Sequence, residues 1–338
     1  MSIVTVGIDL AKNVFAVHGV DAAGKAVLIR PMVARAKLLE LIVGLPPCLI
    51  GMEACSGAHH WARLFQAHGH TVRLMAPKFV APYRLGGKHG KNDAADAAAV
   101  CEAVTRPKMR FVPIKSVDQQ AMLTVHRVRQ GFVEERTALI NRIRGLLSEF
   151  GIVLPLKAAT VTREVAKHLE DLPGMANLAI GDCLSELHRL NERVLEYDRH
   201  LYKLARQDPN ARRVMQLRGV GETTASAVVA TVGNASEFKS SRQFAAWIGI
   251  VPCQYSSGGK TRLGRITKAG DSYLRTLLVL GARSVLATAK RHTDPMSRWA
   301  IALAERRGYG KALVAIAAKN ARMIWAILRK GEAFVATT

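Results

Sequence analysis

The stretch "IVTVGIDLA", from Ile3 to Ala11, decides the fold of the N-terminal part of this chain. It is a short apolar run that ends near Asp9, and two further runs of the same kind follow, "VFAVHGV" and "KAVLIRPM". Short runs rich in β-branched residues and bounded by polar breaks are typical of strands. The sequence therefore predicts a three-stranded meander at the start of the chain.

Helices alternate with strands after this meander. The run "ARAKLLELIVGL" predicts a helix that must end before Pro46 and Pro47, because proline cannot continue it. A strand ("CLIGMEA"), a helix ("HHWARLFQAHG") and another strand ("TVRLMAP") come next. Strands that alternate with helices indicate an α/β layer architecture, and we expect residues 1–115 to form this domain.

The rest of the chain is predicted to be helical. We expect residues 116–210 to form a helical connector and residues 211–338 a mostly helical C-terminal domain. A heptad seam of apolar residues over about 180–204 predicts a coiled coil that joins copies of the chain into a dimer or tetramer. The alternative is a single amphipathic helix packed on its own domain. The seam consists of Ile180, Cys183, Leu187, Leu190, Val194, Tyr197, Leu201 and Leu204.

The charge of the chain points to a polyanionic partner. Lys and Arg number 49 against 26 acidic residues in 338, which gives a net charge of +23. Such an imbalance is self-repulsive unless an anion neutralises it, and nucleic acid is the expected anion. A membrane surface is the alternative, but the sequence contains no lipidation motif and no apolar run long enough for a transmembrane helix.

Cysteine and histidine usage argues against a disulfide framework or a zinc knuckle. The five cysteines are scattered and never form C-x-x-C. This is typical of a reduced, cytoplasmic protein, and with a DNA partner we expect nucleoid association. The patch "HHWARLFQAHGH", from His59 to His70, could suggest zinc, but a solvated helix face is the favoured interpretation.

Four carboxylates stand out in so basic a chain. Asp9 and Glu53 end predicted strands, and an unpaired buried acid there would cost several kcal/mol. Asp93 and Asp96 lie three apart at the start of a predicted helix, so both can face the same way. For Asp96 alone, a first-turn residue favoured by the helix dipole is the simpler interpretation. Together, the four could hold two Mg²⁺ ions that act on a phosphodiester.

Two segments of the C-terminal region could contact phosphate. In "QLRGVGETTASAVVATVG", Gly219 and Gly221 allow a tight hairpin whose N–H groups and following helix N-terminus could hold a phosphate. A plain helix-linking turn would look similar. The second segment surrounds "QYSSGGK", where cations crowd with almost no acid between them, which favours phosphate contact over a solvated charge run. These cations are Lys260, Arg262, Arg265, Lys268 and Arg275.

The N-terminal motifs resemble a known family. "VGIDLAKNVFAV", "GMEACSGAHHWA" and "GKNDAADAAAVCEA" are similar to the motifs of a resolvase-like, RuvC-type ribonuclease H domain. More closely, they resemble the DEDD transposases of bacterial insertion sequences, described as bridge-RNA-guided recombinases. The resemblance implies Asp9, Glu53, Asp93 and Asp96 as metal ligands. The "KHGKND" run matches as well.

The C-terminal motifs extend the resemblance. "QLRGVGETTASAVVATVG" resembles a helix-hairpin-helix element, and "FAAWIGIVPCQYSSGGKTRLGRITKAGDSYLR" is similar to the transposase domain of the same family. In that family, a serine just before the glycine joins covalently to a DNA phosphate. Here that serine is Ser257, with Ser256 as the second choice and more plausibly a support for the turn.

From these features we expect a DNA transposase or recombinase, possible partners being element-end and target DNA and a structured guide RNA. Because Asp93 and Ser257 fall in different predicted domains, the active site could be shared between subunits. One alternative is a RuvC-like endonuclease that hydrolyses Holliday junctions or other branched DNA with metal-activated water. The other is a nucleic-acid-binding protein without catalytic activity.

Overall fold

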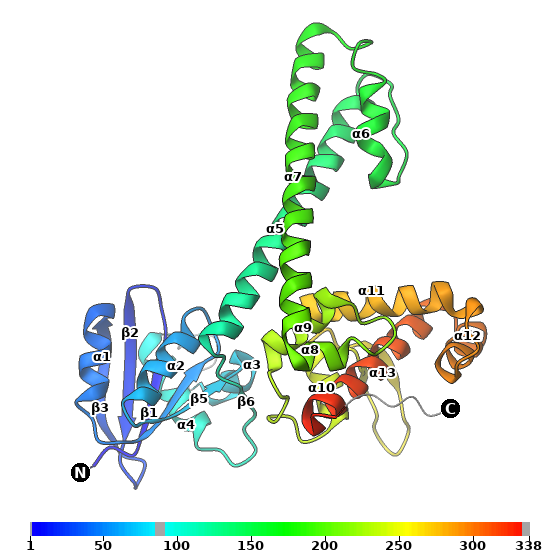
Figure 1. The fold of residues 1–338 in the computed structure, drawn as a ribbon. Helices are drawn as coiled ribbons and strands as arrows, with labels where there is room; N and C mark the ends of the chain where they lie inside the picture. The colour runs from blue at the N-terminus through cyan, green and yellow to red at the C-terminus, as the bar shows by residue number, and fades with distance from the viewer. Residues whose placement is uncertain (1, 85–91, 333–338) are drawn as a thin grey trace. The chain divides into compact units, whose positions relative to one another are not determined.

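The computed structural model describes residues 2–84 and 92–332. The chain forms two compact units, residues 1–116 and residues 117–338. The first unit combines a sheet with helices, and the second is built mainly of helices (Figure 1). The helical connector expected over 116–210 falls in the same unit as the C-terminal region.

A six-stranded mixed sheet forms the centre of the first unit, in the order β3-β2-β1-β4-β5-β6. Strands β1 to β3 are an antiparallel meander, β4 and β5 run parallel to β1, and β6 is antiparallel to β5. The predicted meander is thus confirmed. The strands are β1 (Thr5–Asp9), β2 (Val14–Val20), β3 (Ala26–Ala34), β4 (Leu49–Glu53), β5 (Thr71–Met75) and β6 (Phe111–Val112).

One face of this sheet packs on α1 (Arg35–Val43) and α2 (Ala58–Ala67). Val6 and Ile8 of β1 are fully buried there with Leu38 of α1. Alternate residues of a strand point to opposite faces, so the residues between these two point the other way.

The opposite face is covered by α4 (Asp93–Val104). Its Val100 and Val104 are buried with Met75 of β5. The short helices α3 (Pro77–Val80) and η1 (Ala81–Tyr83) connect β5 toward α4. A mixed sheet with helices on both faces is consistent with a ribonuclease H-like domain.

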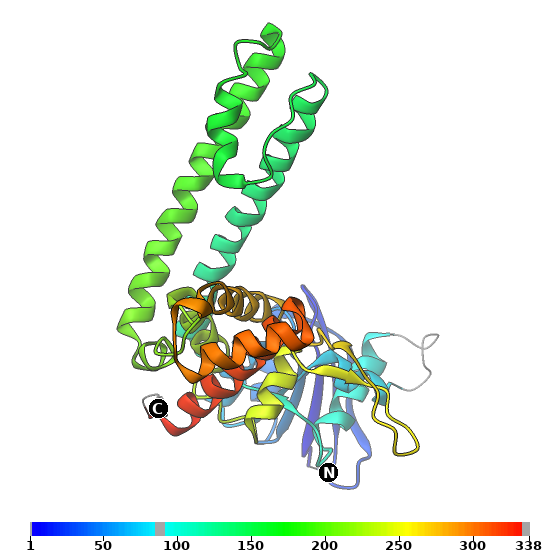
Figure 2. The ribbon, with the colours of Figure 1, turned by 90° about the vertical axis from the view of Figure 1, so that its right-hand side faces the viewer.

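The second unit contains two long helices that run side by side, α5 and α7, with α6 near their far end (Figures 1 and 2). A helical body with one small hairpin, β7 and β8, completes it. The helices are α5 (Val117–Ser148), α6 (Ala158–Ala166), α7 (Gly174–Gln207), α8 (Pro209–Val214), α9 (Glu222–Val232), α10 (Ser241–Ile248), α11 (Ser272–Thr288), η2 (Ala289–Arg291), α12 (Pro295–Arg307) and α13 (Tyr309–Lys330). The strands are β7 (Pro252–Gln254) and β8 (Leu263–Ile266).

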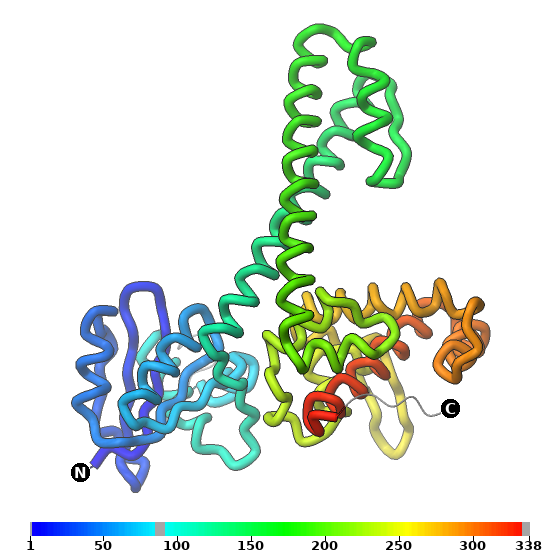
Figure 3. Tube along the Cα trace, viewed as in Figure 1, coloured from blue at the N-terminus to red at the C-terminus, as the bar shows by residue number. Residues whose placement is uncertain are grey.

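The heptad seam of α7 packs on α5 of the same chain, and the tube view follows both helices along their length (Figure 3). Leu187 and Leu190 are buried in one cluster with Ile143 and Leu147 of α5. Intrachain packing is the alternative that the sequence left open, and it supplies the seam with a partner. Association with another chain stays a prediction.

Within the described residues, none of the helices combines the length and the apolar character needed to span a bilayer.

Candidate active site

Two glycines set the distance between the sheet and α4. Gly7 of β1 and Gly51 of β4 are partners in the parallel register. A Cβ atom on Gly7 would lie 2.2 Å from the carbonyl oxygen of Ala97, and one on Gly51 would lie 2.8 Å from Cβ of Val104. Both contacts are too short for real atoms, so the absence of side chains lets α4 approach the strands closely.

The same register aligns two of the predicted carboxylates. Asp9 and Glu53 each lie two residues beyond one of these glycines, at the ends of neighbouring parallel strands. Because the side-chain period of a strand is two, both carboxylates project from the face that α4 covers. Each of them makes at least one polar or electrostatic interaction.

The first turn of α4 carries the other two. The side chain of Asn92 caps the helix by accepting a hydrogen bond of 2.8 Å from the N–H of Ala95. Asp93 is exposed, whereas Asp96 is only 7% exposed. Both lie where the positive end of the helix dipole favours an acid.

Arg84 joins two of these carboxylates. Its Nη2 lies 3.4 Å from Oε1 of Glu53, and its Nε lies 2.7 Å from Oδ1 of Asp96. The Nε and Oδ1 atoms are close enough for an ion pair, yet neither makes a well-directed hydrogen bond within the described residues. Arg84 therefore donates a hydrogen bond to Glu53 and neutralises the charge of Asp96 without a directed hydrogen bond.

The arrangement brings Glu53 and Asp96 together and places Asp9 beside Glu53, with Asp93 at the exposed rim. Among residues 2–84 and 92–332, no three His, Cys, Asp or Glu side chains are grouped closely enough to hold a metal ion. Oxygen donors of this kind nevertheless suit a hard cation such as Mg²⁺. The residues Lys88–Lys91 of the "KHGKND" run lie outside the described residues.

Two of the four histidines of the His59–His70 patch are held by hydrogen bonds within the protein. His59 Nδ1 accepts a hydrogen bond of 3.2 Å from the Lys115 N–H, and burial lowers the pKa of His59 to about 4. His70 is buried between the N–H of Cys48 and the carbonyl of Ile42. The interpretation as a solvated helix face is therefore wrong for these two rings, whereas His60 of α2 and His68 at its C-cap are exposed.

The second candidate element is the hairpin between β7 and β8. Its tip is a tight turn in which the Lys260 N–H donates to the Ser257 carbonyl over 3.0 Å. Gly258 has φ of +54° and Gly259 +75°, a conformation that favours glycine. The two glycines thus shape the loop as the sequence predicts.

The two serines of the loop differ in their hydrogen bonds. Ser256 Oγ accepts from the Arg262 N–H at 3.1 Å and from Nε2 of Gln254 at 2.9 Å, so it braces the hairpin. Ser257 is exposed at the tip, and its hydroxyl makes no hydrogen bond to any described residue. Both serines are exposed, and of the two hydroxyls only that of Ser257 has no hydrogen bond to a described residue.

Most of the predicted phosphate-binding cations surround this hairpin in exposed positions. They are Lys260, Arg262, Arg265 and Lys268. Arg275 differs, because its Nη1 donates to the carbonyls of Ile248 at 3.0 Å and Gly270 at 3.4 Å. A cation on the last carbonyls of a helix stabilises its C-terminus, so Arg275 fixes α10 against the base of the hairpin.

The two glycines of the predicted phosphate-binding turn have separate roles. Gly219 has φ of +78°, and a Cβ atom there would lie 2.5 Å from the carbonyl oxygen of Gly281 in α11. It is therefore required for packing. Gly221 is the exposed N-cap residue of α9, and a Cβ atom there would meet nothing within 4 Å. Of the two glycines, only Gly221 caps a helix, and it is exposed there.

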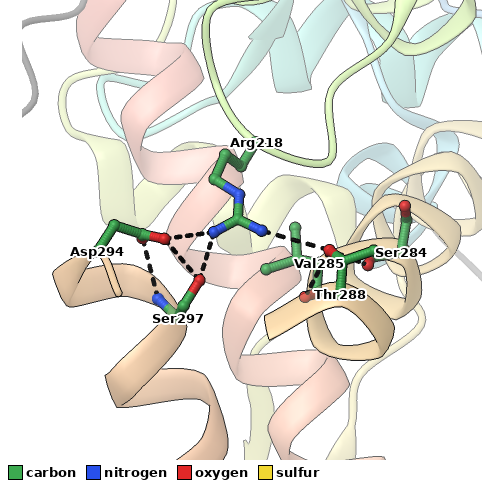
Figure 4. Close-up of polar contacts among 6 residues, drawn as sticks. All are labelled: Arg218, Ser284, Val285, Thr288, Asp294 and Ser297. Atoms are coloured by element: carbon green, nitrogen blue, oxygen red, sulfur yellow. Dashed lines mark hydrogen bonds and ion pairs between the residues drawn. The ribbon is translucent and has the colours of Figure 1, made fainter. Parts of the chain in front are cut away.

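Arg218, which the sequence analysis did not single out, anchors this turn to α12 (Figure 4). Its guanidinium bonds to Asp294, Ser297 and Thr288, the last at 3.3 Å. Hydrogen bonds from Ser297, with the nearby Arg218 charge, lower the pKa of Asp294 to about 2. Arg84 was also missed, although a buried acidic pair requires a nearby cation.

Comparisons with known proteins agree on one family. The model of the "Transposase IS116/IS110/IS902 family" matches residues 211–297, and an IS110-type DEDD model described as "Transposase" matches residues 6–152. The chain is 45% identical over 335 residues to a "Probable family 20 transposase" of Pseudomonas aeruginosa, covering 98% of both chains. It is 42% identical over 339 residues to the "Transposase for insertion sequence element IS1111A" of Coxiella burnetii, covering 97% of this chain and 90% of the relative. It is 37% identical over 339 residues to the IS1328 transposase of Yersinia enterocolitica, covering 98% and 99%.

Proposed function

This chain belongs to the IS116/IS110/IS902 family of transposases, and from that premise we propose that it cuts and rejoins DNA strands through a serine–DNA intermediate. The carboxylates of the first unit and Ser257 of the second unit act in the same reaction. The observation that carries the proposal is the shared register of β1 and β4, which aligns Asp9 with Glu53 on the face covered by α4.

The acidic residues would hold the divalent cation. Asp9, Glu53 and Asp96, joined by Asp93 at the rim, supply the hard oxygen donors that Mg²⁺ prefers, and four carboxylates suffice for two ions. Bound there, Mg²⁺ neutralises charge that develops on the phosphate oxygens during strand cleavage. The protein's own part is to hold these oxygens in fixed positions through strand register and helix packing. We propose a RuvC-like role for this unit on that basis.

Ser257 supplies the nucleophile. Its Oγ attacks the phosphorus of a DNA phosphodiester, a serine O–P bond forms, and the P–O bond to one deoxyribose breaks. The serine proton ends on the sugar oxygen that leaves. The hydroxyl of a second strand then attacks the phosphoserine ester, which re-forms a phosphodiester and regenerates the serine. The exposed hydroxyl at the tip of the hairpin suits this role.

The exposed cations of the hairpin would hold the DNA backbone. Lys260, Arg262, Arg265 and Lys268 have no acidic side chain interleaved with them in sequence and can neutralise phosphates. The N–H groups at Gly221 and the first turn of α9 add a backbone contact of the helix-hairpin-helix kind. Arg275 acts by positioning the hairpin.

We also propose that a structured RNA chooses the DNA sites and that the protein acts as a dimer or tetramer on nucleoid DNA. The net charge of +23 suits a protein that holds both RNA and DNA. Sequencing of the nucleic acid that co-purifies with the protein tests the guide, since random fragments in place of one discrete RNA would contradict it.

Strand exchange by carboxylate variants tests the catalytic assignment. Asp9→Ala and Asp96→Asn should each lower the rate by at least about a hundredfold, because charge stabilisation at the phosphate is lost. Lys37→Ala is the matched control, since it only removes an exposed ion pair with Glu40 in the same unit. If Asp9→Ala exchanged strands at the rate of the unaltered protein, the assignment of an enzyme with this centre would be wrong.

A further inference from the structure

Arg84 lies between two of the proposed metal ligands but has no role in the proposed reaction. Its guanidinium lies between Glu53 of β4 and Asp96 of α4, and the three side chains are only 28%, 15% and 10% exposed. Its backbone N–H donates to the carbonyl of Ala81 over 3.3 Å, so the backbone is held at the end of η1. A change in the position of this guanidinium therefore needs only rotation of the side chain.

Arg84 and a divalent cation require the same oxygens. A guanidinium is a permanent cation, so Arg84 brings a positive charge to both carboxylates. Mg²⁺ binds carboxylate oxygen at about 2.0–2.1 Å. Oδ1 of Asp96 already lies 2.7 Å from Nε of Arg84, and a dication placed against the same oxygen would meet a like charge at contact distance.

The contact between Arg84 and Asp96 is also poorly directed. Neither Nε of Arg84 nor Oδ1 of Asp96 satisfies hydrogen-bond geometry within the described residues, although both atoms are buried. A guanidinium built solely to hold two carboxylates usually does so through parallel, directed hydrogen bonds. The pair thus provides charge neutralisation that another cation could replace.

We propose that Arg84 is a built-in counter-cation that competes with the divalent metal for Glu53 and Asp96. This inference rests on the proposed metal-binding role of these carboxylates. Arg84 stabilises the acidic pair until a divalent cation takes the same oxygens, and its side chain must then rotate away. Metal affinity is consequently lower than the carboxylates alone would give, so the centre loads only at higher concentrations of the cation.

Binding of Mn²⁺, used as the probe without DNA, tests the competition on the full-length chain. Calorimetry should show that Arg84→Ala binds Mn²⁺ about tenfold more tightly than the unaltered protein, which corresponds to loss of an ion pair worth about 1.4 kcal/mol. Arg84→Lys should lie between the two, because an ammonium cannot bridge both carboxylates with a planar fork. Lys37→Ala, which removes one positive charge elsewhere in the unit, should bind as the unaltered protein does.

Thermal unfolding gives a second readout. In EDTA, Arg84→Ala should melt at a lower temperature than the unaltered protein, because Glu53 and Asp96 repel each other without their counter-charge. Saturating Mn²⁺ should close or reverse this difference, because a ligand stabilises the folded state in proportion to its affinity. Arg84→Lys keeps the test valid if the alanine variant does not fold.

The outcomes separate this inference from the proposed function. One outcome is that Arg84→Ala and Arg84→Lys bind Mn²⁺ no more tightly than the unaltered protein, while Asp96→Asn does not bind it. This outcome would overturn the competition and leave the metal centre intact. Absence of Mn²⁺ binding by every one of these proteins would overturn both the competition and the assignment of the carboxylates as metal ligands.

Discussion

Gly7 and Gly51 determine how closely α4 approaches the carboxylates of β1 and β4, because neither glycine has a side chain. Their two Cβ positions are occupied by the backbone of α4 at Ala97 and by the side chain of Val104. The close approach brings the first turn of α4 to the strand ends that carry Asp9 and Glu53. At this scale, a single methyl group would separate the acidic residues from one another.

Gly7→Ala should therefore destabilise the first unit by about 3 kcal/mol or more, because a buried backbone contact must open to admit the methyl group. Gly145→Ala is the contrasting change. Gly145 is exposed in α5 with no atom within 4 Å of its Cβ position, so alanine should stabilise that helix by about 0.5–1 kcal/mol. Denaturant unfolding of both variants measures the difference, and similar effects of the two changes would refute the packing argument.

At the residue scale, the sequence was informative about acids and uninformative about their partners. Asp9 and Glu53 could be selected because an acid inside an apolar run is costly unless it has a role. Arg84 and Arg218 could not, since their partners come from distant segments of the chain. The sequence groups Arg275 with the phosphate-binding cations, because charge near a loop does not reveal which carbonyls the side chain faces.

At the scale of elements, a buried polar chain ties three helices of the second unit together. Ser226 of α9 donates to the Glu222 carbonyl over 2.8 Å, so it must accept from Nε2–H of His126 in α5, 3.1 Å away. Nδ1 of His126 is then the acceptor for the hydroxyl of Tyr273 in α11, at 3.0 Å. His126 is thereby required in one neutral tautomer.

The hydrogen bonds of His126 predict that the stability of the second unit depends on pH. Burial, with the nearby charges of Arg129 and Arg127, lowers the pKa of His126 from 6.5 to about 4. The unfolded state binds the proton more readily, so the stabilisation is fully present above pH 6.5 and is lost as the pH falls toward 4. The loss should be on the order of 3 kcal/mol for the second unit.

Denaturant unfolding of the unaltered protein and of His126→Gln between pH 4 and 7 measures this loss of stability. The variant should have a lower stability at pH 7 and a flatter pH dependence, because glutamine does not titrate. His59, whose pKa is also about 4, lies in the first unit and is unchanged in this variant. The acid response of the first unit therefore serves as the internal reference. An unchanged slope in His126→Gln would show that the buried histidine does not control the acid response.

The elements themselves could be predicted wherever a period is local. The meander and the α/β alternation follow from short apolar runs and breakers, and β1 to β5 lie where those runs lie. The heptad seam of α7 was also visible, but periodicity identifies the buried face of a helix and not the surface that buries it. The surface that buries it belongs to α5, and this contact between helices distant in the sequence cannot be inferred from a local period.

At the scale of the whole molecule, the chain combines a carboxylate centre in one unit with an exposed serine in the other. The net charge of +23 over the whole chain suits a polyanionic substrate such as DNA. A hydrolase would need the carboxylates alone, with water as the nucleophile. In the proposed reaction the phosphoryl group is kept on the protein between cleavage and joining, and Ser257 is the residue that we assign to keep it.

Trapping of a protein–DNA adduct on an element-end substrate, followed by mass spectrometry of the attached peptide, tests this assignment most directly. We predict a phosphodiester bond on Ser257, no adduct with Ser257→Ala, and an adduct still formed by Ser256→Ala at a reduced level because the hairpin loses its brace. An adduct on Ser256, or cleaved DNA with no adduct on any residue, would contradict the account.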